Sequence, residues 1–369
     1  MKIAHLITTI DRGGAEMQLL ELIRKQLSHD HEVNVFYIKG KDYLEEEFTK
    51  LGIKPFRLVD GNFIKKIINF RRIVSASKFE IINAHLPHAE LIASVSLIGL
   101  NKYIFIVTRH FGGQFAPNLP AVISSILSKL MIWKSNGVIV ISRYVGEITK
   151  KNNEIFKKDL WKLNVVPYGI SKREISPRIK PIQKILIGEP IIIGTLARLS
   201  KEKSLETLIY ACKELSTKKI DFKCHIYGEG VLEAELKELT RDLDLSEYIF
   251  FEGMTTEPMK CISRLDIFIS TSIFEGFGLA ILEAMSMGLP IVGARNSAIS
   301  ELLQNERYGL MFTTKSYKEL ANQIEKLQMN KKLYESYSVK SLHRASMYSS
   351  ENNYQKTQKI YDSLLSVRD

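Results

Sequence analysis

The chain has 369 residues, of which 45% are hydrophobic and 25% are charged, and this composition excludes disordered and fibrous proteins. At roughly 100–200 residues per domain, the length predicts two domains. The net charge is +11, and the three cysteines, which form no Cys-x-x-Cys pair, are too few for a disulfide framework and indicate a reducing, cytoplasmic location.

Short apolar runs alternate with amphipathic helical stretches in the first half of the chain. The first run, residues 3–7, is too short for the apolar region of a signal peptide, so we expect a buried strand there. No apolar run reaches the roughly 18 residues that a membrane-spanning helix needs. Further strands are predicted at 33–38, 81–84, 104–108, 138–141 and 165–166, with helices between several of them, for example at 15–27 and 91–100. This alternation is typical of a parallel sheet with helices on both faces.

Residues 171–188 break the alternation, because they are rich in proline and basic residues, and we predict an inter-domain linker there. A second alternation follows, with strands at 191–196, 222–227, 248–251, 267–270, 291–292 and 310–312, and helices at 205–215, 231–243, 279–287 and 317–328. The pattern predicts two doubly wound α/β domains in tandem, 1–180 and 181–347, with a last helix in 348–369 packing back on the first.

The surplus of positive charge lies in the first half of the chain. Residues 1–180 contain 28 Lys and Arg against 16 Asp and Glu, whereas residues 181–369 contain 24 against 25. This asymmetry indicates either an anionic partner, such as acidic lipid or nucleic acid, or a solvated basic face. Nucleic acid is disfavoured because no stripe of basic and aromatic residues occurs. The basic stretches 63–74 and 122–134 either lie on an anionic membrane or bury their apolar faces in the core.

The clearest chemical signal lies in residues 266–289. A predicted strand ends there, and the turn 275–278, Glu-Gly-Phe-Gly, precedes a predicted helix that begins near Leu279. Glycines let the backbone approach a ligand closely, and a helix N-terminus favours an anion such as pyrophosphate. Glu275 in the turn and Glu283 in the helix are placed to accept hydrogen bonds from the hydroxyl groups of a sugar and a ribose.

A cationic pair follows an earlier strand. Arg198 and Lys203 lie in the turn after the predicted strand 191–196, where both side chains can reach a diphosphate. Neutralising a leaving diphosphate is the main electrostatic demand of a sugar transfer without metal. Taken singly, these features also fit ordinary surface acids at a helix start and an ordinary charged turn. Together they predict a site for a phosphorylated sugar.

The segment from Ser272 to Pro290 reads S-x-F-E-G-F-G-L-x-x-L-E-A-M-x-x-G-x-P and resembles the Glu-x7-Glu region of the retaining glycosyltransferases of family 4. Other stretches match the family in the same order, namely 13–16, 83–90, 107–112, 138–144, 165–170, 197–203, 227–230, 251–253 and Glu301. The resemblance implies the GT-B fold, in which two Rossmann-like domains face each other across a cleft. It also implies transfer of a sugar from a nucleotide sugar with retention at the anomeric carbon, without a metal or other cofactor.

The resemblance further implies roles for individual residues. Arg198 and Lys203 would hold the donor diphosphate, and Gly14 would allow its close approach. Glu283 would hold the ribose, and His110 of the first domain would lie over the reacting sugar. The donor sugar and its phosphate would be held by the following turn residues: Glu275 and the backbone of Phe277, Gly278 and Leu279. The chain departs from the family's pattern at Ala197, Ser204 and Tyr168, where Gly, Gly and Asn are common.

We therefore expect a hexosyltransferase of bacterial surface polysaccharide biosynthesis, with a UDP- or GDP-sugar as donor and a glycan or lipid-linked acceptor. The donor would bind the second domain and the acceptor the basic first domain, with the protein at the inner face of the membrane. Two alternatives are a nucleotide-sugar epimerase on the same fold and a non-enzymatic nucleotide or nucleic-acid binder. Incomplete glycine fingerprints at 13–14 and 228–230 count against a nicotinamide or flavin enzyme. His85 and His88 lack an evident third metal ligand.

Overall fold

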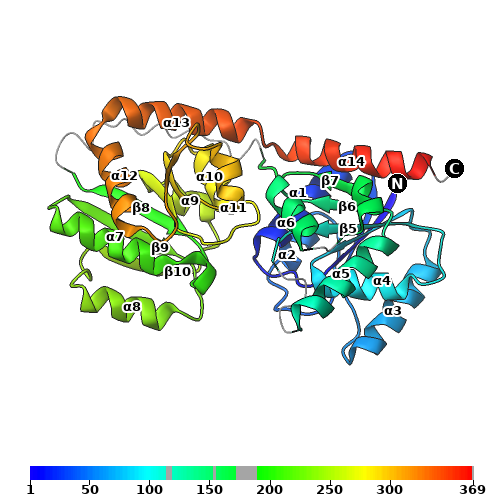
Figure 1. Cartoon of the computed structure of the whole chain (residues 1–369). Helices are drawn as coiled ribbons and strands as arrows, with labels where there is room; N and C mark the ends of the chain where they lie inside the picture. The colour runs from blue at the N-terminus through cyan, green and yellow to red at the C-terminus, as the bar shows by residue number, and fades with distance from the viewer. Residues whose placement is uncertain (114–118, 153–154, 172–188, 368–369) are drawn as a thin grey trace. The chain divides into compact units, whose positions relative to one another are not determined.

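The computed structural model describes residues 1–113, 119–152, 155–171 and 189–367. The chain divides into two compact units, Met1–Gly169 with Ser350–Asp369, and Ile170–Ser349 (Figure 1). Ile170 belongs to the second unit, where its N–H donates to Tyr348 O and the residue forms a β-bridge with Ser349. Apart from Ser171, the predicted linker 171–188 lies outside the described residues.

The first unit contains a seven-stranded parallel sheet with the order β3-β2-β1-β4-β5-β6-β7. Its strands are β1 Lys2–Ile7, β2 Glu32–Tyr37, β3 Phe56–Arg57, β4 Ile81–His85, β5 Ile104–Arg109, β6 Gly137–Val140 and β7 Leu163–Val165. Its helices are α1 Gly14–Ser28, α2 Glu45–Lys50, α3 Phe63–Ala76, α4 Pro87–Ser96, α5 Ala121–Lys134, α6 Arg143–Lys151, the 3₁₀ helix η1 Lys157–Lys162 and α14 Ser350–Ser366. The predicted helix 91–100 begins earlier, at Pro87, because proline is favoured at a first helical position.

The second unit contains a six-stranded parallel sheet with the order β10-β9-β8-β11-β12-β13. Its strands are β8 Ile191–Leu196, β9 Phe222–Tyr227, β10 Ile249–Gly253, β11 Ile267–Ser270, β12 Ile291–Ala294 and β13 Leu310–Phe312. Its helices are the 3₁₀ helix η4 Lys201–Lys203, α7 Leu205–Thr217, α8 Glu233–Asp242, α9 Pro258–Ile262, α10 Leu279–Ser286, α11 Ser297–Leu303, α12 Tyr317–Met329 and α13 Lys331–Ser346. The predicted fold class, two doubly wound α/β sheets in tandem, is confirmed.

The two C-terminal helices belong to different units. Helix α13 lies in the second unit, where the hydroxyls of Ser338 and Ser341 donate to Gly288 O and Leu289 O. Helix α14 lies in the first unit, where the Tyr361 ring is fully buried and its hydroxyl accepts from Asn83 Nδ2 at 2.8 Å. The chain therefore passes from the second unit back to the first at Ser349.

The strand order reverses once in each sheet, between β1 and β4 in the first unit and between β8 and β11 in the second. At such a switch point the connections after the two strands leave in opposite directions, so a crevice opens beyond their carboxyl ends. Each sheet therefore offers one such position for a ligand.

Candidate functional site

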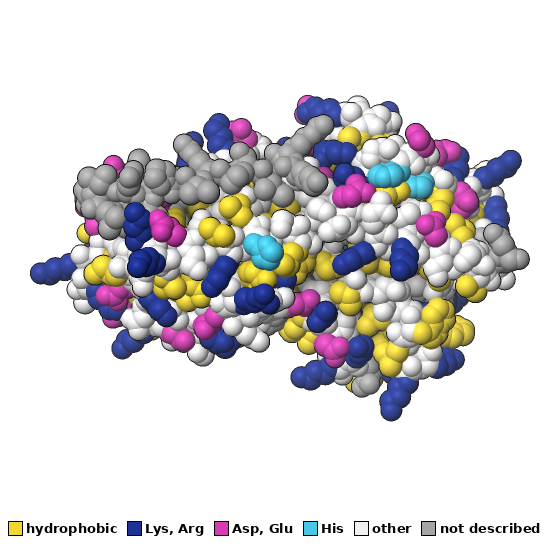
Figure 2. All heavy atoms as spheres, turned by 90° about the horizontal axis from the view of Figure 1, so that it is seen from above, with side chains coloured by type: hydrophobic (Ala, Val, Ile, Leu, Met, Phe, Trp, Pro, Cys, Tyr) yellow, Lys and Arg dark blue, Asp and Glu magenta, His cyan; other side chains and the backbone are white. Residues whose placement is uncertain are grey.

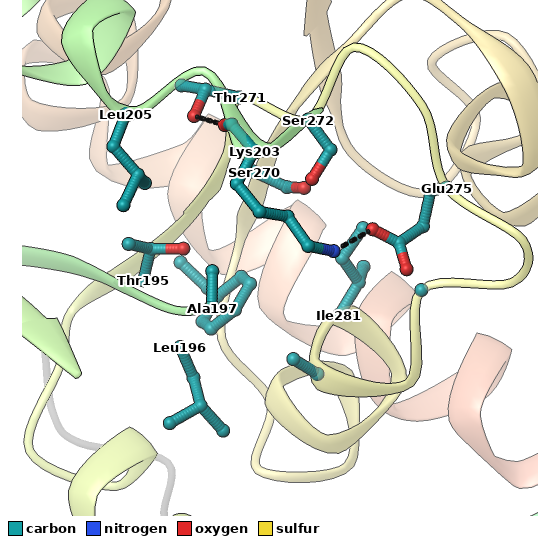
Figure 3. A pocket seen from close by; sticks show the side chains of 13 residues that line it. Thr195, Leu196, Ala197, Lys203, Leu205, Ser270, Thr271, Ser272, Glu275 and Ile281 are labelled. Carbon is teal, nitrogen blue, oxygen red and sulfur yellow. Dashed lines mark hydrogen bonds and ion pairs between the residues drawn. The ribbon is translucent and has the colours of Figure 1, made fainter. Parts of the chain in front are cut away.

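A pocket lies at the carboxyl edge of the second unit's sheet, at the switch point between β8 and β11 (Figure 3). It is lined by the end of β8, the start of α7, the end of β11 and the turn into α10. The lining residues are Thr195, Leu196, Ala197, Lys203, Leu205, Phe268, Ser270, Thr271, Ser272, Glu275, Gly278, Ala280 and Ile281. A crevice with several hydroxyl groups, one cation and one carboxylate suits a polar, anionic ligand that carries hydroxyl groups.

Lys203 and Glu275 meet in this pocket. Lys203 Nζ lies 2.6 Å from Glu275 Oε2, and the two side chains are 16% and 20% exposed. In Figure 3 the Lys203 side chain extends across the pocket to the carboxylate. The Thr271 hydroxyl donates to Lys203 O at 2.7 Å, and the Ile273 N–H donates to Glu202 O at 2.8 Å. These bonds join the turn after β8 to the turn after β11, and they hold the ammonium and the carboxylate at one place.

Gly278 is the N-cap of α10 and lines the pocket. Its φ is +92°, a left-handed conformation that favours glycine, and a Cβ there would lie 3.1 Å from Ile281 Cδ1. The turn therefore favours glycine at this position, and the first turn of α10, whose Ala280 and Ile281 line the pocket, can offer its N–H groups to an anion. Phe277 is buried, and its ring lies edge-on to the Tyr348 ring, with the two ring centres 5.6 Å apart. Leu279 is the first residue of the helix.

Two other predicted donor-binding residues lie outside the set of pocket-lining residues. Arg198 is 78% exposed on its side chain and pairs with Glu202 at 3.0 Å. Glu283 lies one turn into α10, half-buried. The structure thus brings together Lys203, Glu275 and the start of α10, while Arg198 points to a neighbouring glutamate.

Ser204, where the family commonly has glycine, adopts the left-handed backbone conformation that glycine favours. Its φ is +47°, and its hydroxyl lies 2.8 Å from Glu206 Oε1 and 3.0 Å from Thr207 Oγ1. These local hydrogen bonds at the start of α7 offset the cost of a left-handed serine. This departure from the family pattern therefore leaves the turn intact.

Gly14 and His110 belong to the first unit. Gly14 is the first residue of α1, and Gly13 at its N-cap is so close to Glu16 that a Cβ would collide with the carboxylate. His110 follows β5 and lines a second pocket at the carboxyl edge of the first sheet, together with His85 and Tyr168. Burial lowers the pKa of His110 to about 3, so the ring is neutral at neutral pH.

Sequence reasoning missed some residues of the β8–β11 pocket and one buried contact of the first unit. The hydroxyl groups of Ser270, Thr271 and Ser272 line the β8–β11 pocket, and their place at the end of a predicted strand was a usable signal. The contact of His5 with His85 in the first unit joins residues 80 positions apart, and no local pattern reveals it.

The described residues form neither a metal-binding cluster nor a membrane-spanning helix. In that part of the chain no group of three His, Cys, Asp or Glu side chains is placed to hold a metal ion. Among the helices formed by residues 1–113, 119–152, 155–171 and 189–367, none has the length and apolar character to cross a bilayer.

Comparison with known proteins adds to this geometry. Residues 12–173 match the sequence model described as Glycosyltransferase Family 4, and residues 178–343 match the model described as Glycosyl transferases group 1. The alternatives of an epimerase and of a non-enzymatic nucleotide or nucleic-acid binder find no support in these matches.

Individual relatives agree with the family matches. The chain is 26% identical over 365 residues to the N-acetylgalactosamine-N,N'-diacetylbacillosaminyl-diphospho-undecaprenol 4-alpha-N-acetylgalactosaminyltransferase of Campylobacter jejuni, covering 94% of this chain and 95% of that protein. It is 28% identical over 174 residues to the poly(ribitol-phosphate) alpha-N-acetylglucosaminyltransferase of Staphylococcus aureus, covering 47% of this chain and only 35% of that protein.

A solved structure shares the fold. The Anabaena protein Alr3699/HepE, solved in complex with UDP and glucose, superimposes with a TM-score of 0.83 at 18% identity, covering 98% of this chain and 100% of that one. The two family matches together extend over both units, and the chain belongs to the family 4 glycosyltransferases.

Proposed function

We propose that the chain transfers a hexose from a UDP- or GDP-sugar to a hydroxyl of a glycan or lipid-linked acceptor, with retention at the anomeric carbon and without a metal. The observation that carries the proposal is the Lys203–Glu275 pair beside the start of α10 in the β8–β11 pocket. The names of the relatives add support, because they include transferases that act on polymer and undecaprenyl diphosphate substrates. They favour a role in bacterial surface polysaccharide assembly.

The residues of the pocket have complementary tasks in this proposal. The Lys203 ammonium and the N–H groups at the start of α10 stabilise the charge that develops on the leaving diphosphate. Glu275 accepts hydrogen bonds from sugar hydroxyls, and its ion pair with Lys203 holds the carboxylate in the pocket. Arg198 exchanges Glu202 for the diphosphate, and Glu283 accepts from the ribose.

The proposed reaction balances without another reactant. The bond between the anomeric carbon and the diphosphate oxygen breaks, and its electron pair stays on the diphosphate. The acceptor oxygen forms its bond to the anomeric carbon on the same face, and its proton passes to a leaving phosphate oxygen. The second unit holds the donor, and the basic first unit receives the acceptor.

A panel of UDP- and GDP-hexoses tests the proposal, with release of the nucleoside diphosphate as the signal. We expect one donor to be used, with turnover unchanged by EDTA and a product whose anomeric configuration, measured by NMR, equals that of the donor. Lys203→Met and Glu275→Gln should each lower kcat/KM by about 100-fold, by the loss of about 3 kcal/mol of transition-state stabilisation. Lys237→Met is the matched control, since it breaks an exposed pair of the same 2.6 Å length on α8. Full activity of both pocket variants would refute the assigned roles.

A surface of the first unit supports association with a membrane. Helix α5 buries Ser124, Ser128, Met131 and Ile132 and exposes a stripe of large apolar side chains, Val122, Ile123, Ile126, Leu130 and Trp133. A helix that only served the core would show the opposite arrangement, with its serines in water. Of the two basic stretches considered above, α3 exposes three large apolar side chains, Phe63, Ile64 and Ile68, whereas α5 exposes five, so α5 is the stronger candidate.

Helix η1 extends this stripe. Phe156, Leu160 and Trp161 are exposed there, the Lys129 ammonium lies 5.3 Å from the Phe156 ring centre, and Lys162 Nζ donates to Trp133 O at 3.0 Å. We call the exposed apolar residues of α5 and η1, with Lys129, Lys134, Lys157 and Lys158, the α5–η1 surface. Figure 2 shows hydrophobic side chains gathered among Lys and Arg at the lower right, in the half of the picture that holds the first unit.

Apolar and aromatic side chains ringed by lysines fit the interface of an anionic bilayer. We propose that the α5–η1 surface rests on the membrane, which would bring the first unit to a lipid-linked acceptor.

A further inference from the structure

Three imidazole rings form a hydrogen-bonded row inside the first unit. His5 lies on β1, His85 ends the neighbouring β4, and His110 follows the next strand, β5. His5 Nδ1 lies 3.0 Å from His85 Nε2, and His85 Nδ1 lies 3.0 Å from His110 Nε2. The row ends at Gln26 Oε1, 3.0 Å from His5 Nε2, and at the Tyr168 hydroxyl, 2.6 Å from His110 Nδ1.

The Gln26 end gives the row a direction, because the Tyr168 hydroxyl at the other end can either donate or accept. Gln26 Oε1 can only accept, so His5 Nε2 carries a hydrogen, and the neutral His5 ring then accepts at Nδ1. His85 must therefore donate from Nε2 and accept at Nδ1. His110 in turn donates from Nε2 and accepts at Nδ1 from the Tyr168 hydroxyl. One arrangement of hydrogens thus satisfies both nitrogens of all three rings.

We propose that His5 and His85 are positioning residues that hold His110 as a neutral ring with its hydrogen on Nε2, so that Nδ1 is a fixed hydrogen-bond acceptor at the edge of the first sheet. The three rings come from adjacent strands, and His5 and His85 are almost completely buried, whereas His110 is partly exposed. The Gln26 end of the row is therefore buried inside the unit, whereas the His110 end lies near its surface, where the group that donates to Nδ1 can change.

The surroundings of the row agree with neutral rings. Burial lowers the pKa of His5 to about 4 and that of His110 to about 3, while burial and the two neighbouring rings lower the pKa of His85 well below its usual value. A second network holds the strands that carry the rings: Thr108 Oγ1 donates to Asn83 Oδ1, and Asn83 Nδ2 donates to the Tyr361 hydroxyl, both at 2.8 Å.

The residue next to His110 is also fixed. Arg109 Nε lies 2.8 Å from Glu90 Oε2, with both side chains buried, and Arg109 Nη2 donates to Ser128 Oγ at 3.0 Å. The backbone before His110 is thereby tied to α4 and α5. The orientation of the ring is then determined by His85 on one side and by the Tyr168 hydroxyl on the other.

The consequence for ligand binding rests on the proposed function. An acceptor nitrogen recognises a hydroxyl group that donates, which is the chemistry of a sugar. In the structure the Tyr168 hydroxyl holds this position. A sugar hydroxyl can replace the Tyr168 hydroxyl as the donor to Nδ1, and none of the three rings has to change its tautomer for this exchange.

Nitrogen NMR of the full chain labelled with ¹⁵N-histidine tests the row without any substrate. At pH 7 we expect three rings, assigned to His5, His85 and His110 by single substitutions, with protonated Nε2 and unprotonated Nδ1. Hydrogens on Nδ1, or positively charged rings, would overturn the inference whatever the activity of the protein. If the NMR pattern is found but no sugar transfer is detected, the proposed function fails and the row stands.

A matched pair of variants tests the positioning role. His5→Leu and His5→Asn have side chains of similar shape, but only asparagine retains an acceptor oxygen close to the place of Nδ1. We expect His5→Leu to give a mixture of His110 tautomers and to lower kcat by about 10- to 100-fold, with a smaller change in KM for the donor. His5→Asn should retain the wild-type tautomer of His110 and most of kcat.

His88→Gln is the control for this pair, because His88 lies in the same unit but outside the row. It should leave the tautomers and kcat unchanged. Urea denaturation identifies a variant that is merely unfolded, and the NMR signature is then read on the folded fraction. An unchanged His110 tautomer in folded His5→Leu would overturn the positioning role.

Discussion

The α5–η1 surface allows a quantitative prediction about membrane binding. Val122 and Ile126 lie one helical turn apart and are 71% and 52% exposed. Burying a full Val or Ile side chain contributes about 1.5–3 kcal/mol, so the exposed parts of these two contribute about 2 kcal/mol when the surface enters a bilayer interface. The double variant Val122→Ser/Ile126→Ser should therefore bind vesicles about 30-fold more weakly than the wild type.

Flotation with vesicles of phosphatidylglycerol and phosphatidylcholine measures this change. Val231→Ser/Val339→Ser is the matched control, because these valines are 91% and 62% exposed but lie singly in the second unit. The control should bind like the wild type. Equal binding by the α5 double variant, or an equal loss in the control, would refute the assignment of this surface to the membrane.

Three further predictions concern stability and the site. Burial lowers the pKa of His5 from 6.5 to about 4, so His5 takes up a proton in the unfolded chain at a higher pH than in the folded chain. Its contribution to the free energy of unfolding should therefore decrease by about 3 kcal/mol as the pH falls from about 6.5 to about 4. Urea denaturation at several pH values measures this change. Gly278→Ala should lower the free energy of unfolding by about 1–2 kcal/mol, because it places a Cβ at a φ of +92° beside Ile281. The same variant should bind UDP more weakly in calorimetry. An unchanged free energy of unfolding would contradict the argument from backbone strain. Arg109→Met should lower the free energy of unfolding by about 3–5 kcal/mol, because it leaves the buried Glu90 carboxylate without its cation, and an unchanged urea midpoint would contradict this.

Most of the strands could be predicted from the sequence alone, because buried parallel strands are short apolar runs between polar segments. The strands β8, β9 and β11 begin and end at the residues that their apolar runs predict. Helix α13 was not predicted, because it buries tyrosines and serines rather than a regular apolar stripe. The two-residue β3 is too short to give a pattern.

The candidate site was predictable where it depends on strand ends. Lys203 and Glu275 follow neighbouring strands of one parallel sheet, so their meeting follows from the order of the strands. The orientation of Arg198 toward Glu202 was not predictable, because it is a choice between two partners of an exposed side chain. The histidine row depends on register across three strands, and that register is fixed only by the folded sheet.

The most direct test of the central claim is calorimetric titration of a nucleoside diphosphate and of the matching nucleotide sugar into the wild type, Lys203→Met and Glu275→Gln. If the β8–β11 pocket holds the donor as proposed, Lys203→Met weakens both ligands, whereas Glu275→Gln weakens the nucleotide sugar and leaves the nucleoside diphosphate largely unaffected. Wild-type affinity of both variants for both ligands would contradict the account.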